Sequence, residues 1–147
     1  MINLYLMRHG QASFDAQTDE DRSLDSIGCA QVESASRMVT FEADRILVSP
    51  YLRAKQTLVI FNKTRQISVE QTQLITPEAN IEALIDHLTM RQEQSLMIIA
   101  HNPLLSYLAN ALTFEDRYAF NTASIVHLQG EVIAMGCMSL VKEYHQY

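Results

Sequence analysis

The most regular feature of the chain is an alternation of apolar runs with stretches of helical spacing. Residues 2–7 are mostly apolar, residues 46–48 form a short β-branched run, and residues 95–100 form a continuous apolar run, which predicts three strands. The run at 95–100 (SLMIIA) has the composition of a strand buried on both faces of a sheet. A further strand is expected within residues 67–75.

Apolar residues between these runs recur at helical spacing. Ser49 and Asn102 are good N-cap residues, and each precedes a proline, which is tolerated at the first helical position. We therefore expect helices from Pro50 to about residue 62 and from Pro103 onward, and a third that Asn80 caps. An earlier helix is predicted by the helical spacing of Ile27, Ala30, Ala35, Met38 and Val39.

The rest of the chain completes a recognisable architecture. Residues 123–128 and 131–135 flank Gln129-Gly130, which predicts a hairpin, and the last ten residues are expected to form a loose tail. Residues 11–23 are polar and acidic and are expected to form a solvated loop. Strands that alternate with helices predict an α/β protein, a three-layer α/β/α sandwich with a mainly parallel, mixed central sheet.

Composition narrows the class of protein. The 147 residues suit a single domain, and 48% of them are hydrophobic, enough to form a core. No run approaches the ~18 apolar residues of a membrane span, and no basic region precedes the first strand, so we expect a cytoplasmic protein without a signal peptide.

Cys29 and Cys137 are expected to be buried free thiols. A net charge of −6 with scattered lysines and arginines argues against nucleic-acid binding.

Polar residues follow three predicted strands at their carboxyl ends. Arg8 and His9 end the first strand, and Ser49 ends the second, with Arg53 one turn into the next helix. His101 ends the strand at 95–100. Ligands of open α/β sheets bind at this edge, and arginines and helix N-termini both favour an anion. The sequence therefore predicts a phosphate site.

Four sequence blocks also resemble a known family. The blocks are residues 6–10 (LMRHG), residues 22–28 (RSLDSIG) with Gln31, residues 49–57 (SPYLRAKQT) and residues 99–102 (IAHN). They are similar, in this order, to motifs of the histidine phosphatase superfamily, the phosphoglycerate mutase-like family. The similarity reaches from residue 1 to about residue 110. The short length and the wording VSPYLRAKQTL most resemble the SixA-type phosphohistidine phosphatases. The resemblance implies one histidine phosphatase domain over residues 1–147, of phosphoglycerate mutase-like fold and without a sizeable lid insertion.

The resemblance also implies a role for each motif residue. His9 would attack phosphorus and carry a phosphohistidine intermediate, and Arg8 and Arg53 would keep its ring neutral and hold the phosphoryl oxygens. His101 would donate a further hydrogen bond. Contacts to phosphate or substrate are also expected from Arg22, Gly10 and Asn102. Neither a metal nor another cofactor is expected, because phosphoryl transfer needs mainly positioning and charge stabilisation.

The general acid found in larger relatives has no clear counterpart. Glu78 lies near the expected place, and Asp15, Asp19 and Asp21 are weaker candidates. An open site without an acid favours a histidine-phosphorylated signalling (phosphorelay) protein as substrate. The alternatives are a phosphomonoesterase acting on a small phosphate ester and a non-catalytic phosphate-binding adaptor.

Overall fold

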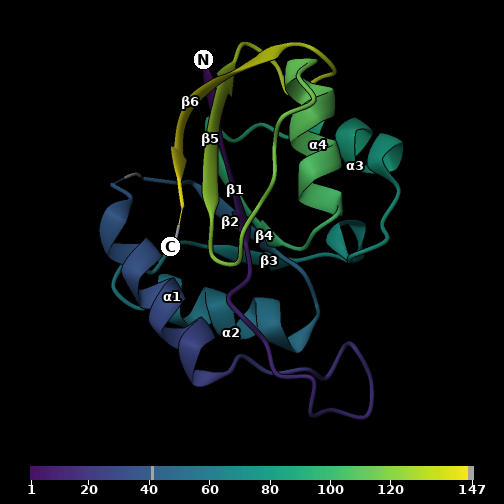
Figure 1. Ribbon diagram of the computed structural model, residues 1–147. Coiled ribbons are helices and arrows are strands. Elements are labelled where there is room, and N and C mark those ends of the chain that lie inside the picture. The colour runs from purple at the N-terminus through teal and green to yellow at the C-terminus, as the bar shows by residue number, and fades with distance from the viewer. Residues whose placement is uncertain (41, 146–147) are drawn as a thin grey trace.

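The computed structural model describes residues 1–40 and 42–145 and shows a six-stranded sheet between two pairs of helices (Figure 1). In chain order the elements are β1 (Ile2–Arg8), α1 (Ser26–Met38), β2 (Arg45–Val48), α2 (Leu52–Phe61), β3 (Val69–Gln71), the 3₁₀ helix η1 (Gln73–Ile75), α3 (Ile81–Thr89), β4 (Ser95–Ala100), α4 (Leu104–Thr113), β5 (Ile125–Gly130) and β6 (Met138–Tyr144). No helix in these ranges is long and apolar enough to cross a membrane.

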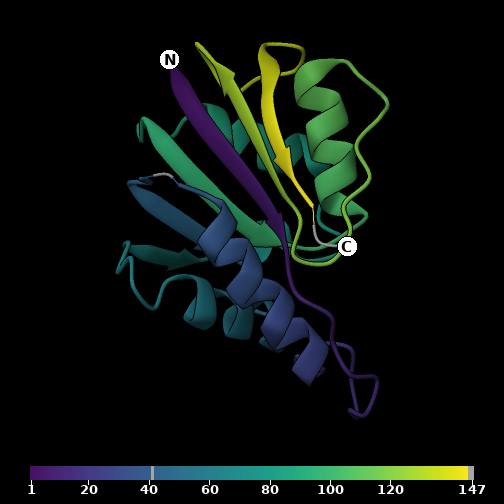
Figure 2. The same ribbon diagram turned by 60° about the vertical axis from the view of Figure 1, so that its left-hand side comes forward.

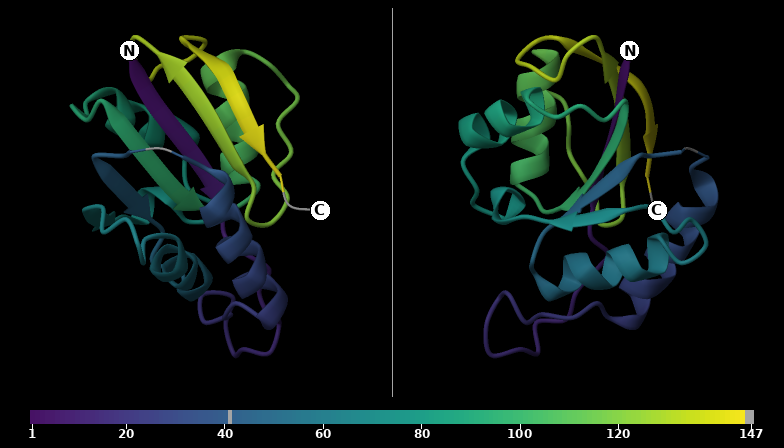
Figure 3. Two further views of the ribbon diagram at one scale, coloured as in Figure 1. Left: turned by 90° about the vertical axis from the view of Figure 1, so that its left-hand side faces the viewer. Right: turned by 180° about the vertical axis from the view of Figure 1, so that it is seen from behind.

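The strands lie in the order β3-β2-β4-β1-β5-β6. The pairs β3–β2, β2–β4 and β4–β1 are parallel, whereas β5 is antiparallel to β1 and β6 to β5. Helices α1 and α2 cover one face of the sheet and α3 and α4 the other (Figures 2 and 3). The prediction of a three-layer sandwich with a mainly parallel, mixed sheet is confirmed.

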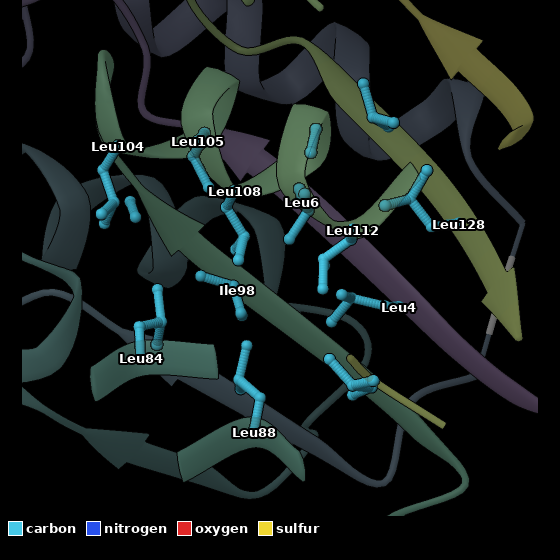
Figure 4. Close-up of a cluster of buried hydrophobic side chains, with 14 of the residues drawn as sticks. Leu4, Leu6, Leu84, Leu88, Ile98, Leu104, Leu105, Leu108, Leu112 and Leu128 are labelled. Atoms are coloured by element: carbon cyan, nitrogen blue, oxygen red, sulfur yellow. The ribbon is translucent and has the colours of Figure 1, made fainter. Parts of the chain in front are cut away.

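A separate hydrophobic core fills each side of the sheet. In β1, Leu4 and Leu6 join the core under α3 and α4, whereas Tyr5 and Met7 join the core under α1 and α2. This alternation follows from the two-residue period of a strand. Figure 4 shows the first core, in which leucines of α3 and α4 pack on β1, β4 and β5. Burial on both faces explains why the central strands read as continuous apolar runs.

The helix predicted after the first loop is α1, but its buried face does not coincide with its apolar residues. Gly28, Val32 and Ala35 are buried, whereas Ile27 and Met38 are 56% and 44% exposed. The reason is a close approach of the helix to the chain after β1, where a Cβ on Gly28 would overlap the Gln11 backbone. The side of the helix that carries Gly28 therefore faces inward, so the apolar spacing predicts this helix but not the face that it buries.

Two of the three predicted caps are also wrong. Helix α2 begins at Leu52 and α4 at Leu104, and neither Ser49 nor Asn102 caps its helix. Ser49 Oγ instead lies 2.6 Å from His101 Nε2, and Asn102 Nδ2 donates to the carbonyl of Phe120. Asn80 does cap α3, because its side chain accepts the Ala83 N–H at 2.9 Å. The two residues that fail as caps therefore turn their side chains toward the carboxyl edge of the sheet.

The C-terminal hairpin is displaced along the chain. The partner of β5 is β6 (Met138–Tyr144), not residues 131–135, which form a turn where Ile133 is buried in the core. Most of the predicted loose tail is thus a paired edge strand, and residues 146–147 of it lie outside the described residues. The apolar signal at Ile133 reflects packing of a turn rather than a strand.

One further expectation is met and one fails. The strand expected within residues 67–75 is present as β3, and η1 follows it with Ile75 buried in the core. Cys29 is half-buried and Cys137 exposed, so these free thiols are not core residues.

Candidate active site

The carboxyl ends of β1, β2 and β4 meet at one edge of the sheet and bring the motif residues together. Arg8 lies opposite Ala100 in the register, and Val48 lies opposite Ile99. A pocket of about 380 Å³ opens at this edge. It is lined by Arg8, His9, Gln11, Ala12, Phe14, Arg22, Arg53, Asn102 and Thr122. Arg8, His9 and Arg53 therefore share one hollow, and His101, which is not a lining residue, lies beside His9.

His9 is held as a neutral imidazole with its ring lone pair on Nε2. Its Nδ1 lies 2.7 Å from the Gly10 carbonyl, which can only accept, so Nδ1 carries the proton. Its Nε2 accepts the Arg53 Nε–H at 3.2 Å. Burial lowers the pKa of His9 to about 4, the Gly10 carbonyl opposes this, and Arg53 and Arg8 lower the pKa further. Burial is thus the main cause of the lowered pKa, and the arginines are a smaller one.

Arg53 and Arg8 flank this imidazole from different elements. Arg53 projects from the first turn of α2, is 4% exposed, and lies between His9 and the loop after β1. Arg8 ends β1 and donates from Nη1 to the Phe120 carbonyl at 2.8 Å. Its buried Nε has no hydrogen-bond partner among the described residues, so this donor is available to a ligand. Two planar forks of donors thus face the pocket.

His101 stands beside His9 and is also neutral. The two ring centroids are 5.2 Å apart, within joint reach of one phosphate. Its Nε2 is tied to Ser49 Oγ, and its buried Nδ1 has no partner within the described ranges. Burial, with smaller effects of His9 and Arg53, lowers the pKa of His101 to about 2. His101 can therefore form a hydrogen bond with a ligand as a neutral ring, and it adds no positive charge to the pocket.

Other motif residues join the loop to the helices. Thr57 Oγ1 accepts the Gly10 N–H at 3.1 Å and donates to the Arg53 carbonyl at 2.8 Å, which joins the segment after His9 to α2. Gln31 on α1 accepts the Gln11 N–H, and Gln56 on α2 accepts the Leu24 N–H. These side chains pin both ends of the loop that carries Arg22.

The residues predicted as contacts fall into two groups. Arg22 and Asn102 line the pocket, and Arg22 also stacks over the Phe14 ring at 4.0 Å. Gly10 is adjacent, but Thr57 takes its N–H, so its carbonyl at His9 Nδ1 is its contribution. Glu78 is exposed in the turn between η1 and α3 and is not a lining residue. The structure therefore does not bring Glu78 to the phosphate pocket.

Asp19 is the site residue that sequence reasoning undervalued. It was expected in a solvated loop, but its carboxylate pairs with Arg53 and Arg22, each at 3.1 Å. Burial acts to raise the pKa of Asp19, and the hydrogen bonds from Arg22 and Arg53 outweigh it and lower that pKa. The carboxylate is therefore ionised and does not hold a proton to give. No periodicity marks such a residue in an irregular loop.

The charges of this pocket suit an anion. Arg8, Arg22 and Arg53 supply three cations against the single carboxylate of Asp19. The described residues contain no group of three or more His, Cys, Asp or Glu side chains that could hold a metal ion. A tetrahedral oxyanion would meet arginine donors on several sides and the His9 lone pair on another, which is the arrangement that phosphoryl transfer to a histidine requires.

Known proteins are similar to this chain in sequence and in fold. Residues 4–76 match the model of the histidine phosphatase superfamily (branch 1). Phosphohistidine phosphatase SixA of Escherichia coli is 33% identical over 133 residues, covering 84% of this chain and 83% of the relative. A phosphohistidine phosphatase SixA homolog of Haemophilus influenzae is 32% identical over 119 residues, covering 71% and 73%.

A solved structure is similar over almost the whole chain. The protein histidine phosphatase SixA complexed with tungstate superposes with a TM-score of 0.86 at 28% identity, covering 98% of this chain and 97% of the other. Tungstate is a tetrahedral oxyanion, so that relative binds an ion of the shape and charge for which the pocket described above is suited.

Proposed function

This chain belongs to the histidine phosphatase superfamily, and from that premise we propose that it is a phosphatase that removes phosphate from phosphohistidine in proteins through a phosphohistidine on its own His9. The observation that carries the proposal is the state of the His9 ring. Its Nδ1–H donates a hydrogen bond to the Gly10 carbonyl, so the lone pair is on Nε2, which faces a pocket lined by arginines. Residues 1–147 then act as a single domain without a sizeable lid insertion.

The first step is attack by His9 Nε2 on the phosphorus of the bound substrate. The Nε2 lone pair forms the new N–P bond while the substrate's P–N bond breaks, and that electron pair leaves with the substrate imidazole. A substrate ring that carries a proton on its other nitrogen departs as a neutral imidazole. Arg53 and Arg8 donate to the equatorial phosphoryl oxygens, and His101 adds a neutral hydrogen bond.

The second step releases phosphate. Water attacks phosphorus, the N–P bond to His9 breaks, and its electron pair returns to Nε2. His9 keeps its Nδ1 proton, hydrogen-bonded to the Gly10 carbonyl, through both steps. The ring therefore begins and ends as the same neutral tautomer. Both protons of the water leave with the phosphate and the solvent. The enzyme therefore needs no proton donor for its own nucleophile.

The absence of a working acid supports phosphohistidine as the substrate. No described residue that lines the pocket is a carboxylic acid, Asp19 is held ionised, and Glu78 lies elsewhere. Serine and sugar phosphates must expel an alkoxide, which leaves poorly without a proton. An imidazole, with a conjugate-acid pKa of about 6.5, leaves with little help. A small-molecule phosphomonoesterase is disfavoured on this ground, and an adaptor would not need a neutral nucleophile.

The test is to trap the intermediate. Wild type mixed with a ³²P-phosphohistidine protein and quenched in alkali should carry an alkali-stable, acid-labile label, and His9→Ala should carry none. His87→Ala, which removes a histidine outside the pocket, is the matched control and should label like wild type. Turnover by His9→Ala at a near-normal rate would contradict covalent catalysis, and unlabelled wild type without turnover would favour the adaptor.

A further inference from the structure

Asp19 makes three contacts with the cationic side of the pocket. Its Oδ2 lies 3.1 Å from Arg53 Nη2 and its Oδ1 lies 3.1 Å from Arg22 Nη1. Its backbone carbonyl accepts from Arg53 Nη1 at 2.6 Å. Within the described residues, it is the only carboxylate paired with an arginine that lines this pocket. One loop residue therefore serves two of the pocket's three arginines.

The two edges of the Arg53 guanidinium have different partners, Asp19 on one and His9 on the other. Asp19 occupies the outer edge, because it binds one hydrogen from each of Nη1 and Nη2. Nε, on the other edge, points at His9 Nε2, 3.2 Å away. A guanidinium is planar and rigid, so fixing one edge fixes the direction of the other. Asp19 thus determines which donors face the atom that attacks phosphorus.

Burial makes this fixing necessary. Arg53 is 4% exposed, so water cannot take over the hydrogen bonds that Asp19 accepts. The loop that presents Asp19 is itself anchored, because the Leu52 N–H at the start of α2 donates to the Glu20 carbonyl at 3.0 Å. The loop residue Asp19 is consequently held against the end of α2 that carries Arg53.

We propose that Asp19 is a positioning residue, which clamps the outer edge of Arg53 so that its Nε edge stays beside His9 Nε2, where the oxygens of a phosphoryl group arrive during transfer. The inference rests on the proposed function of His9. The clamp matters most when the phosphoryl group flattens and its equatorial oxygens must be met at defined angles, and less when a tetrahedral ion is merely bound. Asp19 therefore contributes to the transition state rather than to ground-state affinity.

The experiment compares Asp19→Asn with Asp21→Asn. Both remove one negative charge from the same loop, but Asp21 bonds to Thr18 and has no ion pair with an arginine. For a p-nitrophenyl phosphate substrate, Asp19→Asn should lower kcat about tenfold or more, as loss of alignment does, while KM changes less than about threefold. Vanadate, which adopts a five-coordinate geometry, should bind about tenfold more weakly, and inorganic phosphate about equally. Asp21→Asn should match wild type.

Other outcomes would overturn the inference. If both anions bind Asp19→Asn more tightly with kcat unchanged, Asp19 competes with phosphate instead of aiming Arg53. If both bind more weakly together and the melting temperature falls, its role is structural. If active wild type and Asp19→Asn behave alike, Asp19 has no role. Failure of the proposed function is distinct, because wild type itself would then show neither turnover nor a labelled His9, and the inference would fall with it.

Discussion

At the scale of single residues, the two site histidines are kept uncharged by burial. The pKa of His9 is lowered to about 4 and that of His101 to about 2, in both cases mainly because the rings are removed from water. A nucleophile must present a lone pair, so this environment keeps His9 ready across the neutral range. Arg53 and Arg8 lower the pKa of His9 further, as smaller causes than burial.

The depressed pKa values predict an unusual pH profile. His9 should stay neutral well below the ordinary histidine pKa of about 6.5, so the acidic limb of kcat/KM should have its midpoint near pH 4. The measurement is kcat/KM between pH 3.5 and 8 with a substrate whose own ionisation is known. A midpoint near 6.5 in wild type would mean that the His9 environment is as polar as water.

The same groups predict how stability changes with pH. Below about pH 6.5 the unfolded chain binds protons on these histidines while the folded chain does not, so the free energy of unfolding must fall as the pH falls. This loss should run from about pH 6.5 down through pH 4 for His9 and further for His101. Urea unfolding of wild type and His101→Gln at pH 7 and pH 4.5 would show it, and the variant should lose less stability between the two values. Equal losses would remove His101 from this account.

At the scale of elements, the fit of α1 against the segment after β1 controls the loop that carries Asp19 and Arg22. Gly28 is buried where a Cβ would overlap the Gln11 backbone, and a Cβ on Gly10 would lie 2.7 Å from the Gly28 carbonyl. These are contacts of main chain with main chain, which cannot relax by rotating a side chain. The helix and the loop are therefore one packed unit.

Gly28→Ala should accordingly damage both stability and catalysis. The added methyl group must push the loop away from α1, at a cost of about 1–3 kcal/mol in the free energy of unfolding and a clear loss of kcat. Ile27→Ala is the matched control, since Ile27 is exposed on the same turn and should change stability by less than about 0.5 kcal/mol. The check is urea unfolding with kinetics on both proteins, and a Gly28→Ala protein as stable as wild type would show that the loop can yield.

The same unit shows where sequence reasoning reached its limit. The strand ends that carry Arg8, His9 and His101 could be predicted, because buried parallel strands are continuous apolar runs and their ends share an edge. The buried face of α1 could not, because it depends on main-chain contact at Gly28 and not on the distribution of apolar residues. Nor could the contacts of Asp19, since an irregular loop has no periodicity to locate a side chain.

At the scale of the whole molecule, the open pocket without an acid predicts a steep dependence on the leaving group. Rates on aryl phosphates should rise strongly as the phenol becomes more acidic, and alkyl phosphates should be poor substrates. Glu78→Gln should leave the slope unchanged, because Glu78 lies outside the pocket. The test is a series of aryl phosphates of graded phenol pKa on both proteins. A flat wild-type series that becomes steep in Glu78→Gln would make Glu78 an acid and favour a small-molecule phosphomonoesterase.

Metal independence is a further expectation for the molecule. Its charge stabilisation comes from arginines, and the described residues form no cluster of metal ligands. Turnover should be the same after dialysis against EDTA as before it, with apo- and metal-supplemented protein compared at equal concentration. Activity that disappears in EDTA and returns with an added divalent cation would contradict this expectation.

The pocket is built from residues that are far apart in the sequence. Its lining runs from Arg8 to Thr122, and the hydrogen bonds that shape it join residues separated by 44, 52 and 112 positions. No fragment of the chain can contain it, so an oxyanion that fits it recognises only the fully assembled sheet. Occupancy and global unfolding are then linked by mass action, and vanadate at a hundred times its Kd should add about 2.7 kcal/mol to the free energy of unfolding. Amide protons of β1, β4 and β5 should exchange more slowly together, because each must wait for the same cooperative opening.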